Sequence, residues 1–276
     1  MKSVPLTWLY APGDRPDVVA KALTAGADVV VVDLEDAVAP DRKAYARAAT
    51  AELLRDPQPV PVHVRVNALA GPWGPADVAA LAPAPGLSGL RLPKVSSPSD
   101  VVRVARRAVS ARGGSPPLYA LLETALGVEH AHAVATAHPA LRGIALGEAD
   151  LRADLGVRED AGLDWCRARV VVAARAAGLA PPAQSVHPDI RDLEGLEASC
   201  VRGRGLGFLG RAAIHPRQLP VIERAYLPTE REIEQAETVL KAAAATQGAQ
   251  ALPDGTFVDA AVVTAAHRTL ALAHKR

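Results

Sequence analysis

The chain has 276 residues, a length that suits one α/β barrel; 49% of them are hydrophobic but only 3% are aromatic. We therefore expect a core of alanine, valine and leucine. The 31 basic and 30 acidic residues nearly cancel, which argues against a nucleic-acid-binding or membrane-surface protein. Cys166 and Cys200 have no metal-ligand spacing, and neither a signal peptide nor a transmembrane run is predicted, so we expect a soluble, cytoplasmic protein.

Short apolar runs that end in glycine, proline or a charged residue predict eight strands. They cover residues 6–10, 28–33, 60–66, 89–92, 118–122, 143–146, 183–186 and 212–214. Ala-rich segments of helical spacing lie between them, at 16–25, 43–54, 75–81, 99–111, 128–136, 163–177 and 193–205. Uninterrupted hydrophobic runs such as 29–32 indicate a parallel sheet that is buried on both faces. The alternation predicts a TIM (β/α)8 barrel; a doubly wound open sheet is the rival, but no Gly-rich dinucleotide loop is present.

The character of the sequence changes after Pro216. A helix is predicted over 218–226, and Thr229-Glu-Arg-Glu232 is typical of a capping box that opens another helix to about residue 245. A polar linker, 246–253, leads to Asp254-Gly-Thr-Phe-Val-Asp259 and a last helix over 260–273. The sequence thus predicts a barrel domain over 1–227 and a C-terminal helical extension over 228–276, serving as a lid over its own site or an arm over a neighbour's.

Acidic residues follow two consecutive predicted strands. Glu123 comes directly after residues 118–122, and Glu148 and Asp150 come after 143–146. Glycines beside these acids allow the backbone to approach a ligand closely. Carboxylates at the ends of neighbouring buried strands predict an oxygen-ligand site for a hard cation such as Mg²⁺. The alternative is that each acid is a helix N-cap or a solvated loop residue.

Arg65 lies within an otherwise apolar predicted strand. A guanidinium there must be paired, and Glu35 or Asp36 after the preceding strand are suitable partners. One interpretation is a purely structural buried ion pair. The other is a planar fork that holds a substrate carboxylate beside the metal.

Other polar residues at strand ends allow two interpretations each. Lys94 could form a Schiff base, as in class I aldolases, or could neutralise the nearby acids, and we favour the second role. His187 and His215 each precede a proline in a strand-end turn, where pairing with backbone groups is the simpler role.

Nine segments, spread along nearly the whole chain, carry a family resemblance. Two of them are Leu122-Glu-Thr-Ala-Leu-Gly127 and Leu146-Gly-Glu-Ala-Asp-Leu151. The others are residues 9–16, 33–40, 64–67, 92–95, 192–196, 213–216 and 254–259. Through them the sequence resembles the citrate lyase beta subunit family, within the HpcH/HpaI aldolase superfamily of Mg²⁺-dependent barrels that includes malyl-CoA lyases.

The resemblance implies a role for each candidate at the barrel mouth. It implies that Glu123 and Asp150 are the protein's two Mg²⁺ ligands and that Glu123 also meets the substrate. It further implies that Arg65 binds the substrate carboxylate, with Glu35 and Asp36 beside it.

More distant candidates come from the same resemblance. Arg15 and Lys21 match basic positions that meet coenzyme A phosphates, although solvated side chains are the simpler interpretation. Asp259 matches an acid that reaches in from a neighbouring subunit and takes part in thioester chemistry, although a cap on the last helix would also explain it. This match leads us to expect a homo-oligomer, a trimer.

The expected reaction is cleavage of a 3-hydroxyacyl thioester, such as citryl-CoA to oxaloacetate and an acetyl thioester. The base and proton donor would come from Asp259, Glu35 and Asp36, among which the sequence does not choose. Alternatives on the same site are malyl-CoA lyase, malate synthase and malyl-CoA thioesterase. A further alternative is a non-autonomous subunit of a citrate lyase complex that acts on an acyl carrier protein thioester.

Overall fold

A computed structural model describes residues 4–109, 114–245, 250–251, 255 and 257–274 of the chain. They form two compact units, and the boundary between the units falls within helix α10, Leu219–Tyr226. The first unit covers Pro5–Ile222, and the second contains Val4 and the described residues from Glu223 onward. Among the described residues, no helix has both the length and the apolar character needed to cross a lipid bilayer.

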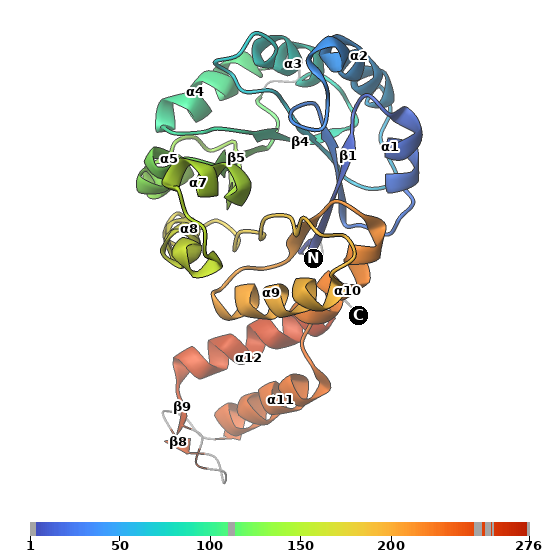
Figure 1. Ribbon diagram of the computed structural model, residues 1–276. Helices are drawn as coiled ribbons and strands as arrows, with labels where there is room; N and C mark the ends of the chain where they lie inside the picture. The colour runs from blue at the N-terminus through green and yellow to red at the C-terminus, as the bar shows by residue number, and fades with distance from the viewer. Residues whose placement is uncertain (1–3, 110–113, 246–249, 252–254, 256, 275–276) are drawn as a thin grey trace. The chain divides into compact units, whose positions relative to one another are not determined.

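The first unit is an α/β barrel built on seven parallel strands, in the spatial order β6-β5-β4-β3-β2-β1-β7. The strands are β1 (Thr7–Pro12), β2 (Val29–Asp33), β3 (Val62–Arg65), β4 (Leu87–Leu92), β5 (Leu118–Leu122), β6 (Leu141–Leu146) and β7 (Arg211–Ala213). All of β2 is buried, as its uninterrupted valines predicted. Figure 1 shows the helices following one another around the outside of the curled sheet. The predicted α/β barrel is confirmed, with one change in its strands.

The strand predicted over 183–186 is wrong. This segment makes only an isolated parallel bridge, between Gln184 and Arg211. Pro181 and Pro182 precede it and Pro188 follows it, so three backbone positions that could donate to a ladder lack an N–H. Toward β6 the connection runs through a side chain, because the Ser185 hydroxyl donates to the Leu146 carbonyl at 2.5 Å and accepts the Glu148 N–H at 3.2 Å. Between β6 and β7 the barrel wall is therefore closed by an irregular segment rather than by a strand of the sheet.

Most helices of the first unit lie where the spacing predicted them. They are α1 (Pro16–Ala22), α2 (Lys43–Leu53), α3 (Gly74–Leu81), α4 (Pro98–Arg107), α5 (Ala125–Glu129), α6 (Ala131–Ala135), α7 (Glu148–Leu155), α8 (Asp164–Ala176) and α9 (Leu193–Gly205), with 3-10 turns at Pro40–Arg42, Asp160–Leu163 and Pro216–Gln218. The helix predicted over 128–136 is instead α5 and α6, because the Thr124 hydroxyl caps the Gly127 N–H and starts the first helix early. Helix α7 was missed, although the acids in its first turn and Gly156 at its end, with φ of 66°, are standard signals.

The second unit contains α11 (Glu230–Ala245), an antiparallel pair of short strands, β8 (Gln250–Ala251) and β9 (Phe257–Val258), and α12 (Ala260–Ala273). The predicted capping box is present: Thr229 Oγ1 accepts the Glu232 N–H at 3.2 Å, and Glu232 Oε2 accepts the Thr229 N–H at 2.8 Å. A small apolar cluster that includes Ala236, Val258 and Ala266 holds the unit together. The linker predicted over 246–253 lies mostly outside the described residues.

Candidate active site at the mouth of the barrel

Charged side chains from five consecutive strands meet at the carboxyl-terminal end of the barrel. Asp33 ends β2, Arg65 ends β3, Lys94 follows β4, Glu123 follows β5, and Asp150 lies in the first turn of α7 after β6. Parallel strands all end on the same side of the sheet, so widely separated sequence positions come together there. Asp33, Arg65, Glu123 and Asp150 line a cavity of about 1,160 Å³. The structure thus brings together the residues that the sequence predicted for the metal and for the substrate carboxylate.

Glu123 is a carboxylate with almost no exposed surface, at 2%. Its Oε2 accepts the backbone N–H of Lys94 at 3.1 Å. Gly147 leaves room for it, since a Cβ at that position would lie 2.5 Å from Glu123 Cγ. Burial raises the pKa of Glu123 to about 7; Glu35 and Asp150 also raise it, whereas Lys94 lowers it. This carboxylate therefore needs a nearby positive charge to remain an anion at neutral pH.

Lys94 places its ammonium among three carboxylates. Nζ lies 3.3 Å from Glu35 Oε1, 3.4 Å from Asp150 Oδ2 and 3.8 Å from Glu123 Oε2. Burial lowers the pKa of Lys94, but the charges of these three acids outweigh burial and raise it above its ordinary value. A Schiff-base lysine needs a neutral amine, so the geometry favours the neutralising role. Lys94 also has a φ of 55°, a left-handed conformation that is uncommon outside glycine.

Arg65 is held mainly by Asp33, a partner that the sequence interpretation missed. Nε and Nη2 donate to the two Asp33 oxygens at 2.8 and 2.6 Å. The predicted partners come second: Nη1 lies 3.0 Å from Glu35 Oε2 and 3.2 Å from Asp36 Oδ2. Asp33 and Arg65 are paired residues in the register of β2 and β3, which is why the bidentate contact forms. Burial lowers the pKa of Arg65, but the hydrogen bond and charge of Asp33, together with Tyr10 and Glu35, outweigh burial and raise it, so the guanidinium stays charged.

The turn after β2 is fixed by the same acid. Asp33 accepts the Glu35 and Ala37 backbone N–H groups at 2.9 and 3.0 Å, and Lys43 Nζ donates to the Leu34 and Glu35 carbonyls at 2.8 and 2.5 Å. Glu35 is consequently buried beside Arg65. Burial raises the pKa of Glu35, and the charge of Arg65 opposes that effect without cancelling it.

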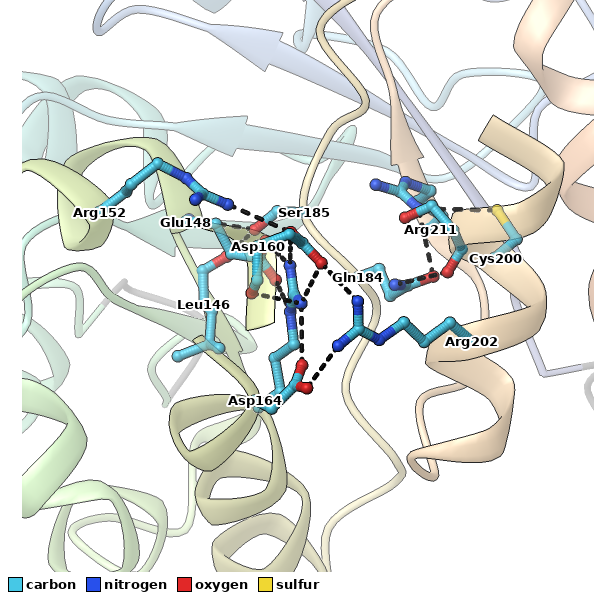
Figure 2. Close-up of polar contacts among 12 residues, drawn as sticks. Leu146, Glu148, Arg152, Asp160, Asp164, Gln184, Ser185, Cys200, Arg202 and Arg211 are labelled. Atoms are coloured by element: carbon cyan, nitrogen blue, oxygen red, sulfur yellow. Dashed lines mark hydrogen bonds and ion pairs between the residues drawn. The ribbon is translucent and has the colours of Figure 1, made fainter. Parts of the chain in front are cut away.

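Glu148 belongs to a second network, shown in Figure 2. Arg167 on α8 donates to both Glu148 oxygens, at 2.9 and 2.7 Å, and to both Asp160 oxygens, at 2.7 and 2.8 Å. Arg202 on α9 binds Asp160 at 2.9 Å and also pairs with Asp164. The network joins α7, α8 and α9 on the side of the barrel where the eighth strand is missing. Glu148 therefore pairs with an arginine and does not belong to the acidic cluster.

We expect Arg167→Met to destabilise the protein by about 3 kcal/mol, because it leaves the half-buried Glu148 without its partner. Urea unfolding at neutral pH measures the loss. Arg175→Met, on the exposed face of the same helix, should change the free energy of unfolding by less than about 0.5 kcal/mol. Equal stability of the two variants would contradict a structural role for the network.

The network also predicts an acid-side loss of stability. Hydrogen bonds from Arg167 lower the pKa of Asp160 to about 2, below the ordinary value of an unfolded aspartate, near 4. The stabilisation from this group is therefore complete above about pH 4 and is lost as the pH falls toward about 2. Thermal unfolding between pH 6 and pH 2.5 should show a smaller decrease in Tm for Asp160→Asn than for the wild type. A parallel decrease would exclude Asp160 as a source of the pH dependence.

The remaining predicted residues lie apart from the acidic cluster. Arg15 is exposed and lines the cavity. Lys21 is exposed on α1, 4.0 Å from Asp17. Asp259 lies in the second unit, where its Oδ1 accepts the Ala261 and Val262 N–H groups at 2.9 Å and caps α12. The functional roles of these three residues stay predictions.

His187 and His215 each have a polar group nearby. His187 lines the cavity, with Nε2 3.4 Å from Asp192 Oδ2. His215 Nδ1 accepts the Arg217 backbone N–H at 3.1 Å and so caps the turn that follows. The simpler, local role predicted for His215 is the one the geometry supports.

The acidic cluster suits a cation that takes few protein ligands. Among the described residues, no group of three or more His, Cys, Asp or Glu side chains has the arrangement of a metal cage. Mg²⁺, however, usually binds through one or two carboxylates and completes its shell with water and substrate oxygens. Glu123 and Asp150, which both lie within 4 Å of one ammonium nitrogen, supply such a pair.

Comparison with known proteins places the chain among barrels of this kind. Residues 6–216 match the HpcH/HpaI aldolase/citrate lyase family. A (3S)-malyl-CoA thioesterase of Cereibacter sphaeroides is 38% identical over 279 residues, covering 96% of this chain and 93% of the relative. The crystal structure of CitE from Mycobacterium tuberculosis in complex with magnesium, acetoacetate and coenzyme A aligns with a TM-score of 0.84 and 34% identity, over 99% of this chain and 100% of that one. The citrate lyase beta subunit of M. tuberculosis complexed with oxaloacetate and magnesium aligns with a TM-score of 0.70 and 35% identity, over 82% and 98%.

Proposed function

The chain belongs to the HpcH/HpaI aldolase/citrate lyase family, and we propose that it is a Mg²⁺-dependent carbon–carbon lyase acting on a 3-hydroxyacyl thioester. Citryl-CoA, cleaved to oxaloacetate and an acetyl thioester, is the substrate that we favour. The main observation behind this proposal is that the carboxylates of Glu123 and Asp150 approach the same point beside Arg65. Similar proteins whose structures hold magnesium with oxaloacetate, or with acetoacetate and coenzyme A, support this choice of ligands.

Glu123 and Asp150 would hold the metal. Glu123 is buried and has a pKa raised to about 7, so a bound dication would restore its anionic form. When bound, Mg²⁺ supplies Lewis-acid polarisation of the substrate oxygens. Lys94 lies among the same carboxylates. Its ammonium would balance the negative charge of the carboxylates that the dication does not neutralise.

Arg65 would orient the substrate carboxylate. Asp33 occupies the edge of the guanidinium formed by Nε and Nη2 and fixes its plane. At Nη1 the guanidinium meets the buried Glu35 and also Asp36, whose side chain is 61% exposed and can move away. A substrate carboxylate taking the place of Asp36 would gain a charge-assisted, fork-shaped contact. Arg65 therefore supplies both position and charge.

Glu35 is the best-placed base for the hydroxyl proton. Its carboxylate oxygens lie 3.0 Å from Arg65 Nη1 and 3.3 Å from Lys94 Nζ, and burial raises its pKa, which makes it a stronger base than an exposed glutamate. Loss of that proton lets the hydroxyl oxygen form the ketone as the carbon–carbon bond breaks. The electron pair of that bond passes to the α-carbon of the leaving thioester as an enolate, which a second acid must protonate. Asp36 and Asp259 stay candidates for that acid. Asp259 would reach the site from a neighbouring subunit of a trimer, through the extension over 228–276.

A thioesterase is the second candidate function, favoured by the 38% identical malyl-CoA thioesterase. Malyl-CoA lyase and malate synthase chemistry would use the same carboxylates and arginine. In each of these reactions coenzyme A would meet Arg15 at the mouth, with Lys21 farther along α1.

The test measures two products from citryl-CoA and malyl-CoA, with Mg²⁺ and with chelator. A lyase yields keto acid without free thiol, and only with Mg²⁺. Free thiol would identify thioesterase or synthase chemistry, in which case Asp259→Asn should suppress thiol release without suppressing keto-acid release. If neither keto acid nor free thiol forms from either substrate, the protein is not an autonomous enzyme. That result would favour a subunit that requires an acyl carrier protein partner.

A further inference from the structure

Arg91 is a buried cation without a counter-ion among the described residues. It lies within β4 and is only 5% exposed, yet its side chain makes no hydrogen bond or ion pair with any other described residue, and its Nε is fully buried. Its contacts are with two aromatic rings: the guanidinium carbon lies 5.8 Å from the centre of Trp8 and 5.6 Å from the centre of Tyr119. Burial of a guanidinium without an anion is costly, so such groups are normally paired.

The position of Arg91 relates it to the candidate site. In the sheet register Arg91 pairs with Arg65 on one side and with Tyr119 on the other. Arg65 lies over Tyr10, whereas Arg91 lies over Trp8, two residues earlier on β1. The guanidinium of Arg91 is therefore one layer of side chains deeper in the barrel than that of Arg65. Both arginines line the same cavity.

The packing of the aromatic rings around Arg91 restricts the position of its side chain. Gly89 and Gly143 leave the space that the Tyr119 ring occupies, since a Cβ would lie 2.7 Å or 3.0 Å from that ring. His63 stacks on Tyr119, with the two ring centres 4.5 Å apart. Burial and the nearby Arg91 charge lower the pKa of His63, so this imidazole is neutral and supplies no compensating anion. The rings of Trp8 and Tyr119 hold the guanidinium in place but carry no negative charge. An anion that balances the guanidinium would therefore have to come from the cavity.

We propose that Arg91 binds the second carboxylate of a dicarboxylic acyl group, such as the outer carboxylate of the oxaloacetate unit in citryl-CoA. This inference rests on the proposed function. The carboxylate and hydroxyl on the reacting carbon face the acids and Arg65, and the bulky thioester carrier must leave through the barrel mouth. The remaining arm of the substrate points inward, toward Arg91. Arg91 thereby selects dicarboxylic over monocarboxylic keto acids.

The test is calorimetric binding of freshly dissolved oxaloacetate and pyruvate to the Mg²⁺-loaded protein. Pyruvate keeps the keto acid group but lacks the second carboxylate. Arg91→Met should weaken oxaloacetate binding by about 10- to 100-fold and leave pyruvate binding within about twofold. Arg107→Met, on the exposed end of α4, is the matched control and should change neither.

Each other outcome overturns a stated part of the inference. If the wild type binds neither acid with Mg²⁺, the proposed function fails and the inference with it. If it binds both, and Arg91→Met weakens both equally or neither, the function stands and the role of Arg91 is wrong. A merely structural Arg91 would lower Tm on substitution without changing the oxaloacetate-to-pyruvate affinity ratio. Should Arg91→Met not fold, Arg91→Lys keeps the charge but loses the fork and must still weaken oxaloacetate selectively.

Discussion

Glu123→Gln should abolish Mg²⁺ binding and reduce kcat/KM by about 10³-fold or more, because it removes one of the two carboxylates, Glu123 and Asp150, that we propose to hold the metal. Glutamine is nearly isosteric, so it fits the space that Gly147 leaves. The metal-free protein should fold normally, because the substitution removes a carboxylate whose burial raises its pKa to about 7. Calorimetric titration with Mg²⁺ and turnover measurements on the same samples test the coupling of the two losses.

Glu129→Gln is the control, since this residue is exposed on α5, the helix that follows Glu123. It should leave metal affinity and kcat/KM unchanged. Full activity of Glu123→Gln in the presence of chelator would disprove the metal-dependent mechanism. Loss of activity with unchanged Mg²⁺ affinity would assign Glu123 a role in proton transfer instead.

Arg65→Lys should lower kcat/KM by about 10²- to 10³-fold while keeping the positive charge. The ammonium cannot bind both Asp33 oxygens and still present a second edge to a substrate carboxylate. Binding of pyruvate should weaken together with catalysis, unlike the selective effect expected at Arg91. Steady-state kinetics and keto-acid calorimetry measure both losses.

The control is Arg55→Lys, at an exposed arginine that pairs with Glu52 three residues earlier. It should have no effect on kinetics. A wild-type kcat/KM for Arg65→Lys would reduce Arg65 to a structural ion pair with Asp33. Destabilisation by itself, detected as a lower Tm with unchanged kinetic constants, would lead to the same conclusion.

The strained backbone of Lys94 points to the same place in the fold. Among the described residues it is the one non-glycine with a positive φ, and its own N–H binds Glu123. Strain of this kind persists where the surrounding contacts over-determine a conformation, and it clusters at functional sites. In this barrel the conformation lets one residue present both its N–H and its ammonium to the acidic cluster.

Much of the fold could be predicted because it depends on local patterns. The valines of β2 indicated a parallel sheet buried on both faces, and the alternation of predicted strands and helices indicated a barrel, whose strands end on one shared rim. The same rule placed Arg65, Lys94, Glu123 and Asp150 together. The strand predicted over 183–186 failed because a hydrophobic run says nothing of whether a neighbouring strand can reach it, and prolines on both sides limit its pairing.

The sequence by itself therefore determined which residues stand at the barrel mouth, since strand order and strand ends are encoded by local hydrophobic runs. The tertiary structure decided how those residues pair. Asp33, rather than Glu35 or Asp36, takes the Nε edge of Arg65; Arg167 from α8 binds Glu148; and Arg91 meets no anion among the residues that the structure describes. Such pairings depend on strand register, sheet curvature and side-chain depth, which arise only when distant segments pack against one another, and a charge pattern along the chain does not contain those distances.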